Sequence, residues 1–121
     1  MSVELKAPVS RYFEATNSHR ADAVAALFSN DGMVRDEGMD HRGCGAIRDW
    51  AESTYRRYDV RVSPTDARED GNATVVRTRV AGSFVGSPLM LSFRFVTSDD
   101  LIDELVVGFR EPEPDQRPGR L

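Results

Sequence analysis

The fold is decided by Met33-Val34-Arg35-Asp36-Glu37-Gly38-Met39-Asp40-His41-Arg42-Gly43. This stretch predicts a short strand that ends in two adjacent carboxylates, Asp36 and Glu37. A glycine turn follows, and Gly43 stands where a helix begins. Because neighbouring residues of a strand point to opposite faces, Asp36 and Glu37 are expected to face opposite ways. We predict that the rest of the chain forms walls around the side chain of Asp36.

The composition is that of a single globular domain. The chain has 121 residues, of which 40% are hydrophobic and 30% charged, and its formal net charge is −4. Charges of both signs are interleaved and form no basic face, which argues against nucleic acid as a partner. No apolar run reaches the length of a signal peptide or the roughly 20 residues that span a bilayer. We therefore expect a cytoplasmic protein that binds no membrane.

Cysteine content limits the chemistry further. Cys44 is the only cysteine, so an intrachain disulfide is excluded and a thiolate metal site within one chain is not expected. A metal would need Asp36, His41 and a further ligand to converge, and nothing in the sequence demands this. We therefore predict neither a metal nor a cofactor.

Three amphipathic helices are predicted from the spacing of apolar residues. The first covers residues 2–17 and has Tyr12 on its apolar face. Pro8 fits in the first turn of this helix, or else the segment before it is a separate turn. The second helix is expected at residues 20–28 and the third at residues 45–57.

After the third helix the apolar period changes from 3.6 to 2, which predicts strands. We expect strands at residues 58–64, 73–84, 89–95 and 101–109, and the blurred alternation of the last one leaves room for a bulge. Earlier in the chain, Ser29-Asn30-Asp31-Gly32 predicts a turn between the second helix and the first strand.

The order of these elements predicts an α+β fold, because the helices come first and an antiparallel meander follows. The apolar face of the sheet must be covered, and the helices are available to cover it. A long, twisted sheet that curls round a helix leaves a concave pocket, and Asp36 is expected near its mouth. Residues 111–121 have the composition of a flexible, proline-rich tail. The domain is therefore expected to cover residues 1–110.

The element order and four local motifs resemble the SnoaL-like proteins of the nuclear transport factor 2-like superfamily. The motifs are Ala25-Ala26-Leu27-Phe28, Val34-Arg35-Asp36-Glu37-Gly38, Ala46-Ile47-Arg48-Asp49-Trp50 and Gly82-Ser83-Phe84-Val85-Gly86-Ser87-Pro88. The resemblance implies a cone-shaped, curved antiparallel sheet wrapped on an N-terminal helix, with two further helices, a helix-lined pocket and a homodimer formed through the sheet. The superfamily includes ketosteroid isomerase, polyketide cyclases, limonene epoxide hydrolase, dehydratases and non-catalytic domains. The resemblance therefore specifies the fold more closely than the activity.

Comparison with ketosteroid isomerase assigns roles to two residues. That family has an aspartate base at the end of the first strand, where Asp36 lies, and a tyrosine oxyanion donor on the first helix, where Tyr12 lies. Its second donor is a protonated aspartate, but this chain has Leu91-Ser92-Phe93 beside Arg94 and no acid there. Loss of one oxyanion donor costs about 3 kcal/mol of barrier. A steroid isomerase is therefore not predicted, and the Arg–Asp pairings expected of an epoxide hydrolase are not evident.

The catalytic candidates are Asp36, Tyr12 and His41. An apolar pocket would raise the pKa of Asp36 and suit it to proton abstraction; alternatively, Asp36 caps the turn or pairs with Arg35 or Arg42. Tyr12 would donate its phenolic proton into the pocket, or else belongs to the core. His41 would exchange a proton near neutral pH, or else lies on a surface loop.

Aromatic and apolar side chains on the helix and strand faces are expected to line the pocket and bind the ligand. They are Trp50, Tyr55, Phe84, Leu91 and Phe93. Asp103 lies two residues from leucines of the last strand that are expected to face inward, so alternation along the strand could turn Asp103 inward as well. Alternatively, Asp103 is exposed beside Glu104. His19 is expected to be exposed or to cap a helix.

The predicted function is that of a protein with a pocket for a small hydrophobic organic ligand. As an enzyme it would use cofactor-independent acid–base chemistry, with Asp36 taking a proton from carbon or from water. Isomerisation, cyclisation, dehydration and hydrolysis all stay open. The alternatives are a non-catalytic ligand-binding or association module, and a structural dimer with a vestigial cavity.

Overall fold

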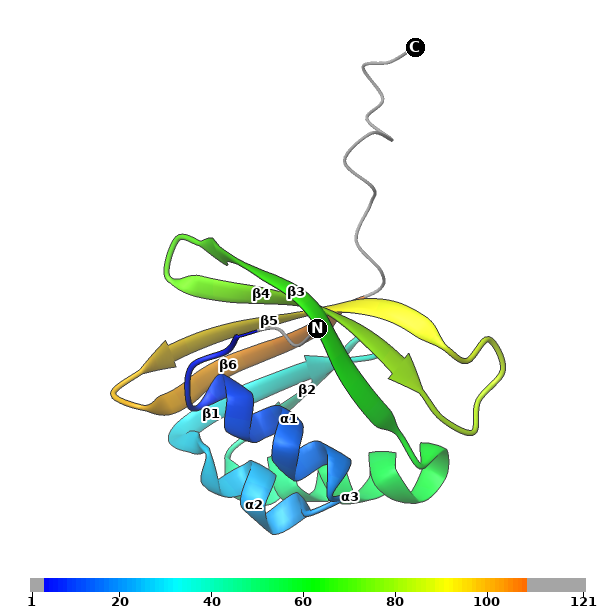
Figure 1. Ribbon diagram of the computed structural model, residues 1–121. Coiled ribbons are helices and arrows are strands. Elements are labelled where there is room, and N and C mark those ends of the chain that lie inside the picture. Colours follow the sequence, from blue (N-terminus) through cyan, green and yellow to red (C-terminus); the bar gives the residue numbers. More distant parts are fainter. Residues whose placement is uncertain (1–3, 109–121) are drawn as a thin grey trace.

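The computed structural model describes residues 4–108, which form three helices packed against one curved sheet (Figure 1). The helices are α1 (Val9–Asn17), α2 (Ala21–Ala26) and α3 (Cys44–Tyr58). The strands are β1 (Phe28–Asp36), β2 (Met39–Arg42), β3 (Arg61–Asp70), β4 (Ala73–Ala81), β5 (Leu89–Ser98) and β6 (Leu101–Gly108). The predicted α+β class is confirmed, whereas the predicted tail at residues 111–121 lies outside the described residues. None of the helices within residues 4–108 is long and apolar enough to cross a membrane.

The sheet has the strand order β2-β1-β6-β5-β4-β3. All neighbouring strands are antiparallel except β1 and β6, which run parallel. The sheet is therefore mixed, which differs from the antiparallel sheet that was expected. A parallel pair needs a long crossover instead of a hairpin, and the chain between β1 and β6 supplies one by way of α3 and the β3–β5 meander.

Strand β1 begins earlier than predicted. The segment Ser29–Gly32 was expected to be a turn before the strand but lies inside it. The pairing of β1 with β6 jumps there from Phe28 opposite Ile102 to Met33 opposite Glu104. The turn-forming residues thus produce an irregularity within the strand instead of a break before it.

Strand β2 was not predicted. It pairs with β1 from Asp36 opposite Met39 to Met33 opposite Arg42, and the turn between the strands consists of Glu37 and Gly38. Both turn residues have positive φ, 54° and 76°. Glycine adopts this conformation freely, whereas Glu37 is held in it by the tight connection.

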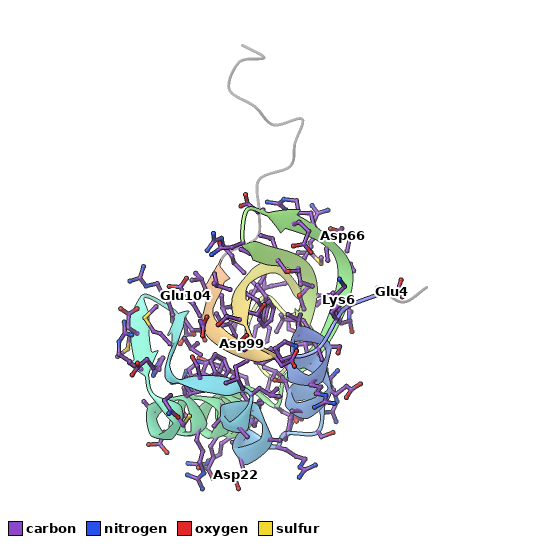
Figure 2. The ribbon with its side chains drawn as sticks, turned by 90° about the vertical axis from the view of Figure 1, so that its left-hand side faces the viewer. Glu4, Lys6, Asp22, Asp66, Asp99 and Glu104 are labelled. Atoms are coloured by element: carbon purple, nitrogen blue, oxygen red, sulfur yellow. The ribbon has the colours of Figure 1, made fainter. Side chains whose placement is uncertain are left out.

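Helix α1 begins at Val9, so it is shorter than predicted and the segment before Pro8 is separate from it. Its buried face packs on aromatic side chains of β5. The ring centroid of Tyr12 lies 5.4 Å from that of Phe95, and that of Phe13 lies 5.6 Å from that of Phe93. Figure 2 shows the strands curling around an interior filled with side chains, with Asp66 on the outer surface of the sheet. The core therefore lies between the helices and the concave face of the sheet.

Candidate functional site

A cavity of about 210 Å³ lies between the helices and the concave face of the sheet. Helices α1 and α3 form one wall, strands β3 to β6 form the other, and the end of β1 completes the lining. All three tyrosines of the chain and its single tryptophan line this cavity. These side chains combine an apolar body with one hydrogen-bond donor. The cavity is therefore mostly apolar and has a few hydrogen-bond donors in its walls, as is typical of a small-molecule site.

Asp36 is the last residue of β1 and lines the cavity with a half-buried carboxylate. Its side chain points to the same face of the strand as Val34, which is fully buried. The indole N–H of Trp50 on α3 donates a hydrogen bond to Asp36 Oδ2 at 3.0 Å. One carboxylate oxygen is thus fixed by the helix.

The pKa of Asp36 is raised above that of an ordinary aspartate. The main cause is burial, and the negative charge of Glu37 adds to it. The hydrogen bond from Trp50 and the nearby His41 act in the opposite direction and limit the rise in pKa. A carboxylate with a raised pKa is a stronger base, so this environment suits Asp36 to accept a proton.

Tyr12 lies on α1, is 3% exposed and also lines the cavity. Burial raises its pKa far above the ordinary value for tyrosine, and the charges of Tyr55 and Asp36 act in the same direction. The phenol therefore keeps its proton at any physiological pH. Tyr12 can donate a hydrogen bond but cannot serve as a base.

His41 does not line this cavity. It lines a separate groove of about 370 Å³ between β2 and α3. Its ring centroid lies 6.1 Å from that of Trp50, and Trp50 lines both hollows. His41 pairs with Val34, two residues before Asp36 along β1, and this register places it beside the groove. Asp36 also lines both hollows, so it shares the cavity with Tyr12 and the groove with His41, whereas Tyr12 and His41 share neither.

The residues expected to bind a ligand all line the cavity, namely Trp50, Tyr55, Phe84, Leu91 and Phe93. Sequence reasoning missed Thr16, which is 3% exposed and receives a hydrogen bond from the Tyr55 hydroxyl at 3.1 Å. Its position one helical turn after Tyr12 was the available signal.

Glu37 was expected to face away from the pocket, yet it also lines the cavity. The reason is that Glu37 belongs to the β1–β2 turn, so the alternation of a strand does not apply to it. Its carboxylate is exposed and lies 3.4 Å from the Arg57 guanidinium.

Asp103, His19 and Cys44 lie outside the cavity lining. Hydroxyl groups of Ser29 and Ser98 donate to the Asp103 carboxylate at 2.8 and 2.7 Å and lower its pKa. His19 stacks on the Tyr55 ring with a centroid distance of 4.8 Å. Within residues 4–108, no group of three or more His, Cys, Asp or Glu side chains could hold a metal ion.

A curved sheet that encloses an apolar cavity with three helices defines the nuclear transport factor 2-like class of fold. Within this class, the chain belongs to the SnoaL-like domain family, whose pattern matches residues 9–108. No curated protein matches the chain.

Several solved structures are similar to this chain. A candidate polyketide cyclase from Sinorhizobium meliloti, SMa1630, is 33% identical with a TM-score of 0.78, over 82% of this chain and 91% of that chain. A protein with a ketosteroid isomerase-like fold from Catenulispora acidiphila, crystallised with trimethylamine, is 21% identical with a TM-score of 0.76. The match covers 87% of this chain and 88% of that chain. SalBIII, an epoxide hydrolase/cyclase-like enzyme with a role in pyran ring formation in salinomycin, is 18% identical with a TM-score of 0.72. The match covers 83% of this chain and 85% of that chain. The last two likenesses show the fold alone.

Proposed function

We propose that the protein is a cofactor-independent acid–base enzyme that acts on a small, uncharged organic substrate, with Asp36 as the general base. The observation that carries this proposal is the Asp36 carboxylate in an apolar cavity, where burial raises its pKa and the Trp50 indole fixes one of its oxygens. Asp36 would remove a proton from carbon next to a carbonyl group. Tyr12 would donate a hydrogen bond to the oxygen on which negative charge develops.

The size and charge of the cavity limit the substrate. Its volume of about 210 Å³ lies below the range of roughly 300–1,000 Å³ that is common for ligand pockets, so a compact molecule fits best. Among the described residues, the lining contains two carboxylates and no Lys, Arg or His side chain. A carboxylate or phosphate group would meet no positive charge there. The similarity to a candidate polyketide cyclase favours cyclisation over isomerisation, dehydration and hydrolysis.

Exchange of carbon-bound hydrogen tests this proposal without knowledge of the natural substrate. A base that removes a proton next to a carbonyl exchanges it for deuterium in D₂O, which proton NMR detects for acetophenone, cyclohexanone and 2-cyclohexen-1-one. We expect the wild type to accelerate the exchange and Asp36→Asn to lose about 10²- to 10⁴-fold of that acceleration. The control is Asp103→Asn, which removes an acid outside the cavity lining and should leave the exchange rate unchanged. Equal rates for the wild type and Asp36→Asn would refute Asp36 as the base.

A non-catalytic binding protein is the second candidate. The sheet positions beside Arg94 carry Leu91 and Phe93, so the cavity lacks the second buried acid of a ketosteroid isomerase site. An aromatic lining with two carboxylates also suits a small alkylammonium ion, in line with the trimethylamine held by the Catenulispora acidiphila structure. Because Trp50 is the only tryptophan, its fluorescence reports occupancy of the cavity. Quenching by trimethylammonium, together with ketones that bind but never exchange, would favour this candidate.

A further inference from the structure

The groove beside His41 meets the cavity at a boundary of four side chains. Two of them come from the end of β1 and the turn that follows it, and two lie one turn apart on α3. The residues that line both hollows are Asp36, Glu37, Trp50 and Thr54. The cavity therefore ends between β1 and α3, and the groove of about 370 Å³ begins on the far side of that boundary.

The two halves of this boundary differ. Asp36 and Trp50 are joined by their hydrogen bond of 3.0 Å, which closes one half. Within residues 4–108 no hydrogen bond joins Glu37 to Thr54, because the Glu37 carboxylate lies against Arg57 and the Thr54 hydroxyl makes no hydrogen bond. Glu37 is exposed and Thr54 is half-buried. A ligand beside Asp36 can thus continue between Glu37 and Thr54 into the groove without breaking a hydrogen bond.

The charges that line the groove are mostly balanced by neighbouring charges. Glu37 lies 3.4 Å from the Arg57 guanidinium, and Asp49 lies 3.6 Å from that of Arg48. Asp36 is the third acid of the lining and is already assigned to proton transfer. An ionic group of a ligand would meet charges of both signs there. The groove therefore favours an uncharged group.

Hydrogen-bonding capacity is left over along the groove. His41, Ser53 and Thr54 are half-buried, line the groove and make no hydrogen bond within residues 4–108. By contrast, the hydroxyl groups of Ser29 and Ser98 both donate to a carboxylate. A ligand that covers the three groove side chains must replace their contacts with water. A hydroxylated chain can do so, whereas an alkyl chain cannot.

We infer that this groove is the second half of the substrate site, and that it binds an uncharged, hydroxylated arm of a molecule whose carbonyl part occupies the cavity. The inference rests on the proposed function and names its substrate class, a compact ketone with an oxygenated chain on the reacting carbon. The chain belongs on that carbon because Asp36, which removes the proton, lies at the boundary between the two hollows. His41 and Ser53 contact the arm and take no part in the proton transfer.

Titration calorimetry with three ketones tests this second half-site. The ketones are acetophenone, 5-hydroxy-1-phenylpentan-1-one and 1-phenylhexan-1-one. The first has no arm, and the other two differ only in a terminal hydroxyl or methyl group on the arm. We expect Ser53→Ala and His41→Ala to weaken binding of the hydroxy ketone roughly threefold to tenfold each, the worth of one hydrogen bond. Binding of the other two ketones should not weaken.

Matched variants separate a contact with the arm from a general disturbance. Ser63→Ala removes a hydroxyl outside both linings and should leave all three affinities unchanged. Ser53→Thr keeps the hydroxyl and should keep the affinity for the hydroxy ketone. Alanine favours a helix, so Ser53→Ala on α3 decides the matter if His41→Ala does not fold.

Three results would overturn the inference. They are an unchanged affinity for the hydroxy ketone in both Ser53→Ala and His41→Ala, an equal loss for all three ketones, and failure of the wild type to bind the hydroxy ketone. The titration needs no turnover. Deuterium exchange that depends on Asp36, with no effect of the groove variants on binding, would refute the half-site and leave the proposed function standing. Loss of binding in the groove variants, without exchange by the wild type, would refute the proposed function and leave the groove as a binding site.

Discussion

Replacing Asp36 by asparagine should change the way in which thermal stability depends on pH. Burial raises the pKa of Asp36 in the folded state above the value of about 3.9 for an unperturbed aspartate. Below that pH the carboxyl group is protonated in both the folded and the unfolded protein. As the pH rises toward the folded-state pKa, the unfolded chain loses its proton first, so the wild type loses stability relative to Asp36→Asn. The loss stops once the folded carboxyl group has also ionised.

The size of this effect follows from linkage. One group contributes at most about 1.4 kcal/mol per pH unit to the difference in the free energy of unfolding. With about 2.1 cal/mol/K of unfolding entropy per residue, a chain of 121 residues converts that slope to roughly 5 °C in Tm per pH unit. Asp36 is half-buried, and screening by solvent narrows the pH window over which this slope applies.

The assay is a series of thermal melts of both proteins by circular dichroism, from about pH 3 to pH 8. The Tm of Asp36→Asn minus that of the wild type should increase with pH and then level off. Asp103→Asn is the matched control with the opposite sign, because hydrogen bonds from Ser98 and Ser29 lower the pKa of Asp103. The wild type should lose stability relative to that variant as the pH falls through the folded-state pKa of Asp103. A Tm difference for Asp36→Asn that is constant, or that increases toward acid, would refute the assigned environment of Asp36.

Three further substitutions test other parts of the structure. Phe95→Ala removes a fully buried ring and should lower the free energy of unfolding by about 3–5 kcal/mol in urea titrations; a loss below about 1 kcal/mol would contradict its place in the core. Gly82→Ala would bring a Cβ against the Tyr58 carbonyl oxygen and should cost about 1–3 kcal/mol, so an unchanged Tm would count against that close approach. Trp50→Phe removes the hydrogen bond to Asp36 and should raise the pKa of Asp36 further in carbon-13 NMR titrations; an unchanged or lower pKa would show that the indole does not stabilise the carboxylate.

Helical periodicity predicted much of the fold, but pairing between strands is less visible in the sequence. The third helix was expected at residues 45–57 and is observed at Cys44–Tyr58. Strand β2 has no alternation of apolar residues, so only its pairing with β1 makes it a strand. Strand β3 was expected to end at Pro64 but continues to Asp70, because an edge strand tolerates proline on its unpaired side.

The candidate site was predictable where one element determines the direction of a side chain. Alternation along β1 directed Asp36 inward, and helical spacing directed Tyr12 inward. Thr16 was missed because a threonine on an apolar helix face is interpreted as a packing residue, and its partner Tyr55 is 39 residues away in the chain. The position of His41 depends on the register of β2, which the sequence pattern does not reveal.

The parallel pairing of β1 with β6 has a consequence for how this protein is made. Phe28 of β1 pairs with Ile102 of β6, so the strand that ends in Asp36 gains its second neighbour only from a strand that is synthesised more than 60 residues later. During translation the earlier helices and hairpins can form, but β1 stays without that partner until β6 leaves the ribosome. Contacts so distant in sequence are slow to close, and an unpaired strand edge invites aggregation. A nascent chain that stalls before Leu101 should therefore depend on chaperones, and ligand binding should arise only after β6 has paired with β1.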